Sequence, residues 1–209
     1  MYWAYAFLLI FAIFCAWNWV EMKLKGAKED KEEESFWERE RKANSTRRKP
    51  LDNLEFITIP TDLPFDVLSD NPELTAYVNT VKKLSSEKIL NLTGYTNTDL
   101  KLEYGAPNIT ELSLYDQNYT NMVTSMQKWA EILEKNGCME DSVKILEFMV
   151  STKVDISKTY KTLAQYYIAN GDSQKFEALL DTAAELKSMN TKYLVRDLEE
   201  MKKEYDNLI

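Results

Sequence analysis

The residues that determine the fold are SKTYKTLAQYYIANGDSQKFEALLDTAAELK, positions 157–187. Apolar side chains recur every three or four positions on both sides of Asn170-Gly171, as in two amphipathic helices joined by a tight turn. A second such pair, Asn136-Gly137, lies 34 residues earlier. A period of this length predicts stacked helical hairpins. The same step pairs apolar or aromatic residues along both helices: Met126 with Tyr160, Trp129 with Leu163, Ala130 with Ala164, Leu133 with Tyr167, Ile145 with Leu179, Leu146 with Leu180 and Met149 with Ala183.

This pattern resembles the tetratricopeptide repeat, whose first helix carries a large residue, a Leu followed by Gly or Ala, an aromatic residue and a turn Gly. The matching positions are Tyr160, Leu163-Ala164, Tyr167, Gly171-Asp172, Leu180 and Ala183 in the second copy, and Met126, Trp129-Ala130, Leu133 and Gly137 in the first. The small residue expected early in the second helix is Ser142 in one copy and Phe176 in the other. We expect Phe176 to separate its two helices or to change their crossing. Two generic hairpins with a coincident period are the alternative interpretation.

Together with the hairpins, the remaining sequence predicts an all-α protein. The predicted protein has a single N-terminal transmembrane helix, followed by a soluble domain of tetratricopeptide-like hairpins with a C-terminal capping helix. Four helix starts are indicated: Asn71-Pro72 for a helix to Leu84, Ser86 for a short helix ending at Gly94, Asn97 or Thr98 for one ending at Gly105, and Asn108 with Glu111 as a capping box. The predicted parts are 1–20 (transmembrane helix), 21–49 (charged juxtamembrane linker or stalk helix), 50–70 (extended segment docked on the domain), 71–118 (helical), 119–190 (two hairpins) and 191–209 (capping helix).

Residues 1–20 contain no charged side chain; they read MYWAYAFLLIFAIFCAWNWV. A helix of this length spans the roughly 30 Å hydrocarbon layer of a bilayer. Amphipathic rings at both ends fit the two headgroup layers, and the predicted anchor residues are Tyr2, Trp3, Tyr5, Trp17 and Trp19. A cleaved signal peptide is the alternative, but the basic start and the small-residue cleavage site that it needs are both missing. We therefore expect an uncleaved anchor in the lipid bilayer.

The flanking charges predict which way the anchor points. No Lys or Arg precedes it, whereas ten follow within residues 21–49. The positive-inside tendency therefore places the soluble domain in the cytoplasm, at the plasma membrane. Four Asn-x-Ser/Thr triplets argue for the opposite topology, an extracellular glycosylated domain; they begin at Asn44, Asn91, Asn108 and Asn118. An Asn- and Thr-rich chain produces such triplets by chance.

Composition argues against several functional classes. The chain has no His, which excludes the commonest general base and the usual zinc ligand. Its two Cys, Cys15 and Cys138, lie far apart in the sequence and predict no disulfide. Asp and Glu (34) outnumber Lys and Arg (26), and the acidic excess lies in 50–209, so nucleic-acid binding is not expected. We expect no enzyme and no cofactor. The alternative, an oxygen-ligand metal or carboxylate site, would draw on Asn97, Asp99, Glu103, Asn108 and Asp116, which also serve as helix caps.

Stacked hairpins expose a concave face formed by the first helix of each pair. The residues predicted to bind a protein or peptide partner there are Thr124, Gln127, Glu131, Glu134, Lys158, Lys161, Gln165 and Ile168. The whole arrangement is also similar to a group of membrane-anchored proteins of clostridial bacteria, on the stretches SFWERERKANSTRRKPL (35–51), FITIPTDLPF (56–65), ILNLTGYTNTDLKLEYG (89–105) and LYDQNYTNM (114–122). This resemblance implies a Gram-positive bacterial origin. The expected function is a membrane-anchored scaffold or adaptor; the alternative is a structural or accessory subunit, or a self-associating protein, without a peptide-binding role.

Overall fold

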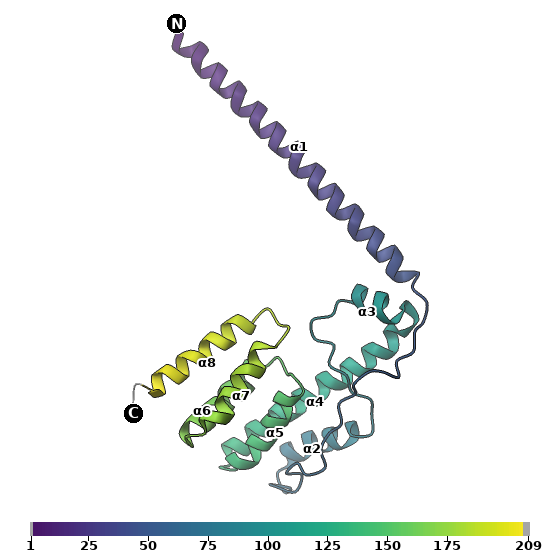
Figure 1. The fold of residues 1–209 in the computed structure, drawn as a ribbon, viewed down its shortest axis with the longest axis vertical. Helices are drawn as coiled ribbons and strands as arrows, with labels where there is room; N and C mark the ends of the chain where they lie inside the picture. Colours follow the sequence, from purple (N-terminus) through teal and green to yellow (C-terminus); the bar gives the residue numbers. More distant parts are fainter. Residues whose placement is uncertain (1, 207–209) are drawn as a thin grey trace. The chain divides into compact units, whose positions relative to one another are not determined.

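The computed structural model describes the backbone of residues 2–206 and the side chains of residues 11, 13–23 and 33–204. Every regular element in this part of the chain is helical, which confirms the all-α prediction. The elements in chain order (Figure 1) are α1 (Tyr2–Asn44), α2 (Pro72–Leu84), α3 (Asn97–Tyr104), the 3-10 helix η1 (Ala106–Asn108), α4 (Ile109–Lys135), α5 (Met139–Ser151), α6 (Ser157–Ala169), α7 (Ser173–Ala184) and α8 (Thr191–Asp206).

The chain forms two compact units. The first contains Met1–Lys49 and Thr96–Asn108, and the second contains Pro50–Tyr95 and Ile109–Ile209. This differs from the sequence-based division, which placed α3 and η1 with the rest of 71–118. The physical reason is that the polar side chains of α3 pair with α1, a long-range partnership that no local pattern encodes.

The first unit is a long helix with a short helix fixed to its end. Arg39 pairs with Asp99 at 2.5 Å, and Glu40 accepts hydrogen bonds from Thr98 and Lys101. After α1 the chain runs along α3, where the Lys49 amide donates to the carbonyl of Tyr104 at 3.0 Å. In addition, the Ala106 amide donates to the Thr46 carbonyl at 3.1 Å. Side-chain and backbone bonds together therefore hold α3 against the last turns of α1.

The predicted membrane span lies mostly outside the described side chains, which begin only at residue 11. Among the residues that are described, no helix combines the length and the apolar character needed to cross a bilayer. The side chains of Tyr2, Trp3 and Tyr5 fall outside the described set, whereas Trp17 and Trp19 are described and exposed. The helix itself continues without a break past residue 20 into the charged segment. The membrane span therefore stays a prediction.

The second unit stacks its helices so that neighbours along the chain pack together, with α2 against α4 and then α5, α6, α7 and α8 in turn (Figure 1). The turns of the two hairpins repeat with the offset that the sequence predicts. Gly137 and Gly171 both have a positive φ, at 80° and 68°. The hydrogen bonds of the two turns also correspond: Gly137 N to Glu134 O and Gly171 N to Ile168 O, both 3.1 Å, and Cys138 N to Leu133 O and Asp172 N to Tyr167 O, both 2.9 Å. The period is therefore a property of the three-dimensional structure as well as of the sequence.

The core of this unit is built from the apolar residues that the period pairs. Of these fourteen residues, all but Leu180 are buried, and Leu180 packs against the core. Residues 50–70 contain no helix or strand, yet Ile59 and Leu63 are buried, and the ring centres of Phe65 and Trp129 are 5.2 Å apart. The apolar side chains of this extended segment thus contribute to the same core.

Three local predictions differ from the structure. No helix follows Ser86, because residues 88–92 lie along α4, with the Leu90 amide donating to the Tyr115 carbonyl at 3.3 Å. The N-cap of α3 is Thr96, which forms a capping box with Asp99, and not Asn97 or Thr98. Asn108 ends η1, and its side chain bonds to Arg48, Lys49 and Tyr104. Contacts distant in sequence decide the local conformation at residues 88–92 and at Asn108, whereas the cap of α3 is set by the local pair of Thr96 and Asp99.

Candidate interaction face

The eight predicted binding residues lie on the first helices of the two hairpins. Thr124, Gln127, Glu131 and Glu134 are on α4, and Lys158, Lys161, Gln165 and Ile168 follow one repeat period later on α6. Their exposure is uneven: Thr124, Lys158 and Gln165 are exposed, Gln127 is buried, and the other four are half-buried. We call this set the α4–α6 face.

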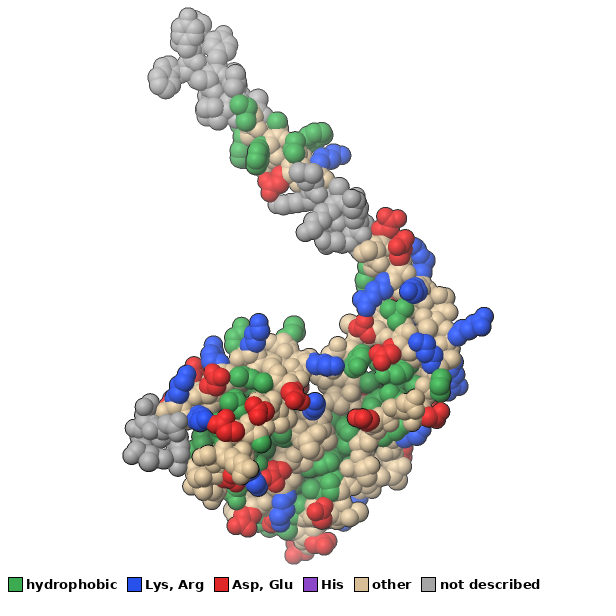
Figure 2. Space-filling model, viewed as in Figure 1, with side chains coloured by type: hydrophobic (Ala, Val, Ile, Leu, Met, Phe, Trp, Pro, Cys, Tyr) green, Lys and Arg blue, Asp and Glu red, His purple; other side chains and the backbone are tan. Residues whose placement is uncertain are grey.

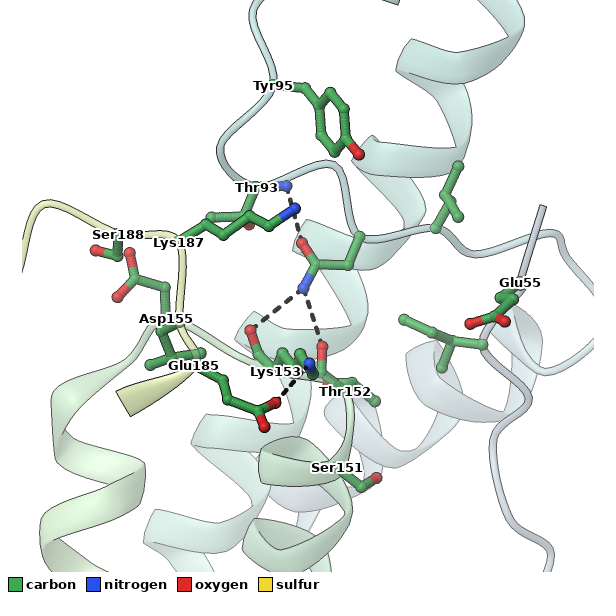
Figure 3. Close-up of a pocket in the computed structure, with 14 residues that line it drawn as sticks. Glu55, Thr93, Tyr95, Ser151, Thr152, Lys153, Asp155, Glu185, Lys187 and Ser188 are labelled. Atoms are coloured by element: carbon green, nitrogen blue, oxygen red, sulfur yellow. Dashed lines mark hydrogen bonds and ion pairs between the residues drawn. The ribbon is translucent and has the colours of Figure 1, made fainter. Parts of the chain in front are cut away.

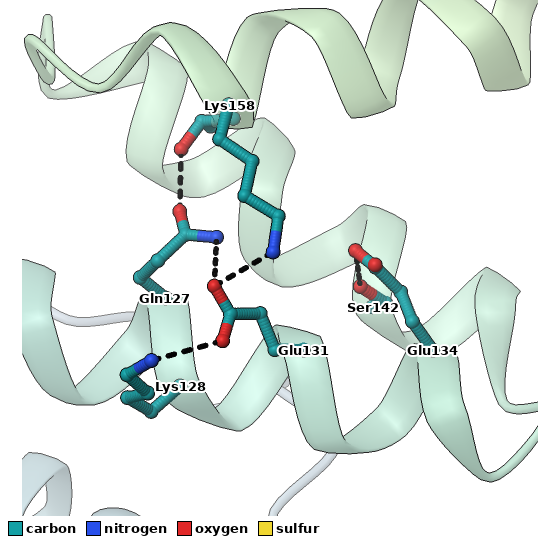
Figure 4. Close-up of polar contacts among 7 residues, drawn as sticks. Gln127, Lys128, Glu131, Glu134, Ser142 and Lys158 are labelled. Atoms are coloured by element: carbon teal, nitrogen blue, oxygen red, sulfur yellow. Dashed lines mark hydrogen bonds and ion pairs between the residues drawn. The ribbon is translucent and has the colours of Figure 1, made fainter.

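A hydrogen-bonded network centred on Glu131 crosses from α4 to α6 (Figure 4). Lys158 donates to Glu131 Oε1 at 2.8 Å, and Lys128 donates to Glu131 Oε2 at 3.1 Å. Gln127 Nε2 is 3.4 Å from Glu131 Oε1, while Gln127 Oε1 accepts a 2.7 Å hydrogen bond from the buried hydroxyl of Thr159. Glu131, Gln127 and Lys158 therefore join the two hairpins to each other before any partner is present.

The network perturbs the ionisation of its central carboxyl. Hydrogen bonds from Lys158, Lys128 and Gln127 lower the pKa of Glu131 to about 2, and burial opposes them only in part. The pKa of Lys128 is raised by its hydrogen bond to the same carboxylate. Glu131 is therefore anionic at any pH near neutrality, and its charge is balanced within the face.

Two further residues of the face are also engaged within the chain. Glu134 accepts a hydrogen bond from Ser142 of α5 at 3.2 Å, and Lys161 pairs with Asp197 of α8 at 2.8 Å. By contrast, Thr124 and Gln165 make no side-chain hydrogen bond within the described part of the chain. The polar groups of the face that remain available to a partner are therefore the side chains of Thr124 and Gln165, together with the solvent-exposed parts of Lys158 and Lys161.

Sequence reasoning missed three members of this arrangement. Lys128 could have been found, because it lies three residues before Glu131 on one helix. Thr159 and Asp197 carried no signal, since their partners lie 32 and 36 residues away on other helices.

Figure 2 shows acidic and basic side chains interspersed on the visible surface.

No family model, curated protein or solved structure matches this chain.

The polar residues of the Gly94–Tyr119 segment act as caps and anchors. Asp99 caps α3, and the Asp116 carboxylate accepts from the Leu92 amide at 3.2 Å. Asn118 donates to the Lys88 carbonyl at 3.0 Å. Where side chains are described, no group of three or more Cys, Asp or Glu is placed to hold a metal ion. These residues support the fold of the segment in which they lie.

The Glu131 network makes stability depend on pH. The pKa of Glu131 is about 2 in the folded protein and 4.5 ordinarily, so the ionised carboxylate stabilises the fold fully above pH 4.5, and this stabilisation is lost as pH falls toward 2. We expect Glu131→Gln to lower the free energy of unfolding by about 1–2 kcal/mol near neutrality. The value is modest because the two lysines are half-exposed to solvent. Chemical denaturation of both proteins between pH 2 and 7 measures this. Parallel pH profiles for the two proteins would contradict the assignment.

Proposed function

We propose that this protein is a membrane-tethered interaction module, a scaffold or adaptor whose tetratricopeptide-like hairpins recruit a protein partner at the cytoplasmic face of a bacterial membrane. The observation that carries the proposal is the recurrence of the same turn hydrogen bonds in α4–α5 and α6–α7, one repeat period apart. Repeated hairpins stack into extended surfaces that suit peptides and partner helices. The α4–α6 face, with exposed Thr124 and Gln165, is the surface proposed for binding.

The anchor rests on the uncharged stretch of residues 1–20, and the cytoplasmic orientation rests on the basic residues that follow it. The structure adds support for the orientation through the Asn-x-Ser/Thr triplets. Asn108 is fully buried and Asn118 is 9% exposed. The side-chain amide of Asn91 donates to the carbonyl of Thr152 at 2.9 Å. A glycan on any of these three nitrogens would displace a hydrogen bond that the fold uses, so these three triplets lend no weight to a glycosylated ectodomain. The fourth triplet begins at Asn44, which is exposed.

A pair of variants tests the proposed face. Gln165→Arg places a long charged side chain on α6 within the face, and Gln174→Arg makes the same change on α7, outside it. Both glutamines are exposed and make no side-chain hydrogen bond in the described part of the chain. We expect Gln165→Arg to reduce recovery of co-purifying proteins about tenfold, which corresponds to about 1.4 kcal/mol of binding free energy.

The measurement is quantitative mass spectrometry of proteins that co-purify with the tagged full chain from bacterial membranes in mild detergent. Gln174→Arg is expected to recover the same proteins as the unmodified chain. Equal loss with both variants, or no specific protein with the unmodified chain, would disprove the proposal.

A second function, self-assembly through the stalk, is favoured by one observation. Phe36 and Trp37 on α1 are each more than half exposed and meet edge to face, with ring centres 5.3 Å apart. Aromatic residues are enriched at protein–protein interfaces relative to the rest of the surface. The solution mass of the purified chain distinguishes the two functions, because a concentration-dependent oligomer favours self-assembly.

A further inference from the structure

A cavity of about 370 Å³ opens among the loops of the second unit, and none of its lining residues belongs to the Glu131 network (Figure 3). Four segments line it: residues 55–57, residues 90–95, the loop between α5 and α6, and the loop between α7 and α8. Its volume is within the range of roughly 300–1,000 Å³ typical of ligand sites. We call it the loop-edge cavity.

The floor of the cavity is held by the side chain of Asn91. Its amide donates to the carbonyls of Thr152 and Lys153, at 2.9 and 3.3 Å, and to the hydroxyl of Tyr119 at 3.1 Å. Its carbonyl oxygen accepts from the Thr93 amide at 2.9 Å. Both ends of this one side chain are thus engaged, and they join the 90–95 segment to the loop between α5 and α6. The cavity is therefore built into the fold.

Gly94 brings a second wall into place. Its φ is +89°, and a Cβ at this position would lie 3.1 Å from Cβ and 3.2 Å from the carbonyl oxygen of Lys187. The close approach positions Lys187 beside the neighbouring ring of Tyr95, with 5.5 Å between the ammonium nitrogen and the ring centre. In Figure 3 the Lys187 side chain extends toward Thr93, inside the cavity.

The charges on the walls are partly balanced and partly free. Lys153 and Glu185 neutralise each other at 2.9 Å. Lys187, Asp155 and Glu55 have no ion pair and no hydrogen bond within the described part of the chain, apart from the contact of Lys187 with the Tyr95 ring. Figure 3 places Glu55 on the opposite side of the cavity from Asp155 and Ser188. The cavity therefore presents one free ammonium and two free carboxylates on separate walls.

We propose that the loop-edge cavity binds a short extended peptide segment that carries both an acidic and a basic side chain. The acidic side chain pairs with Lys187 above the Tyr95 ring, and the basic side chain pairs with Asp155 or Glu55. A ligand with a single charge would leave the wall charges of one sign without a partner, whereas a mixed-charge segment pairs with Lys187 and with one of the two carboxylates. The free groups lie on different segments, so an extended chain reaches them better than a compact ion does.

Calorimetric titration of the detergent-purified full chain tests this site. The probes are acetylated and amidated peptides with one Asp and one Lys separated by one to three Gly, in both orders. We expect at least one of them to bind, and both Lys187→Met and the double variant Asp155→Asn with Glu55→Gln to weaken its binding about tenfold. The matched control is Lys192→Met, at an exposed position of α8 that does not line the cavity.

Peptides with two Asp or two Lys are expected to bind at least tenfold more weakly than the mixed peptide. An equal affinity for a same-charge peptide would overturn the proposal, as would an unchanged affinity in Lys187→Met or the absence of any mixed-peptide binding. Thermal unfolding of each variant confirms that the fold persists. The outcome is independent of the partner of the α4–α6 face, so this inference and the proposed function can fail separately.

Discussion

Gly105→Ala is expected to release α3 from the end of α1. Gly105 has a φ of +95°, and a Cβ there would lie 2.2 Å from the carbonyl oxygen and 2.7 Å from the carbonyl carbon of Arg47. Both of these atoms belong to the backbone, so no side-chain rotation can relieve the clash. The positive φ adds a conformational cost of about 1 kcal/mol or more for a residue with a Cβ. We expect the free energy of unfolding of the first unit to fall by on the order of 3 kcal/mol or more, since the backbone at Gly105 must move away from that of Arg47.

Amide hydrogen exchange measures this loss, because the amides of α3 become exchangeable whenever the unit opens. A loss of about 3 kcal/mol corresponds to exchange roughly 100-fold faster over 97–104. Gly171→Ala is the matched control: its φ is +68°, but a Cβ there meets nothing within 4 Å. It is expected to cost only about 1 kcal/mol, confined to its own turn. Similar small effects in both variants would show that the close approach at Gly105 is unimportant.

Trp129→Ala should be the most destabilising single truncation of the second unit. Trp129 is fully buried in α4 and is the largest side chain in the core. Its ring packs on Phe65, and its indole nitrogen finds no hydrogen-bond partner among the residues whose side chains are described. Truncation of a buried Trp costs about 3–5 kcal/mol, against a total stability of about 5–15 kcal/mol for a domain.

Chemical denaturation of the full chain, followed by far-ultraviolet circular dichroism, measures the change. Limited proteolysis should also show faster cleavage within residues 50–70, because Phe65 loses its packing partner. Trp37→Ala removes the same side chain from an exposed site, with 53% of Trp37 accessible, and should change stability by less than about 0.5 kcal/mol. Comparable losses in the two variants would contradict the packing assignment.

The hairpins were predictable because their information is local. Helix periodicity, the two Asn-Gly turns and the constant offset between them all lie within a short stretch of sequence, and the structure reproduces them in matching hydrogen bonds. The docking of α3 was not predictable, since Arg39 and Asp99 are 60 residues apart and either could have remained solvated. The extended path of residues 88–92 is a similar case, because it depends on α4 side chains that follow much later in the chain.

The candidate site shows the same distinction. The period placed all eight residues of the α4–α6 face on the first helices, but it could not reveal that Glu131 is already satisfied by Lys158 and Lys128. Polar residues on a repeat surface look alike in sequence whether they face a partner or each other. The loop-edge cavity gave no signal either, since its walls come from four separate segments and its floor depends on one Asn.

The uninterrupted course of α1 has a geometric consequence. At about 1.5 Å per residue, the helix beyond Val20 extends about 36 Å before it ends at Asn44. In the proposed arrangement, the length of this stalk sets the distance between the bilayer and the residues that hold α3, which are Arg39 and Glu40. It also fixes their angular phase, because each residue turns the helix by about 100°. Removing one residue from the stalk would rotate that attachment to another side, whereas removing seven would shorten the reach by about 10 Å and nearly restore the phase.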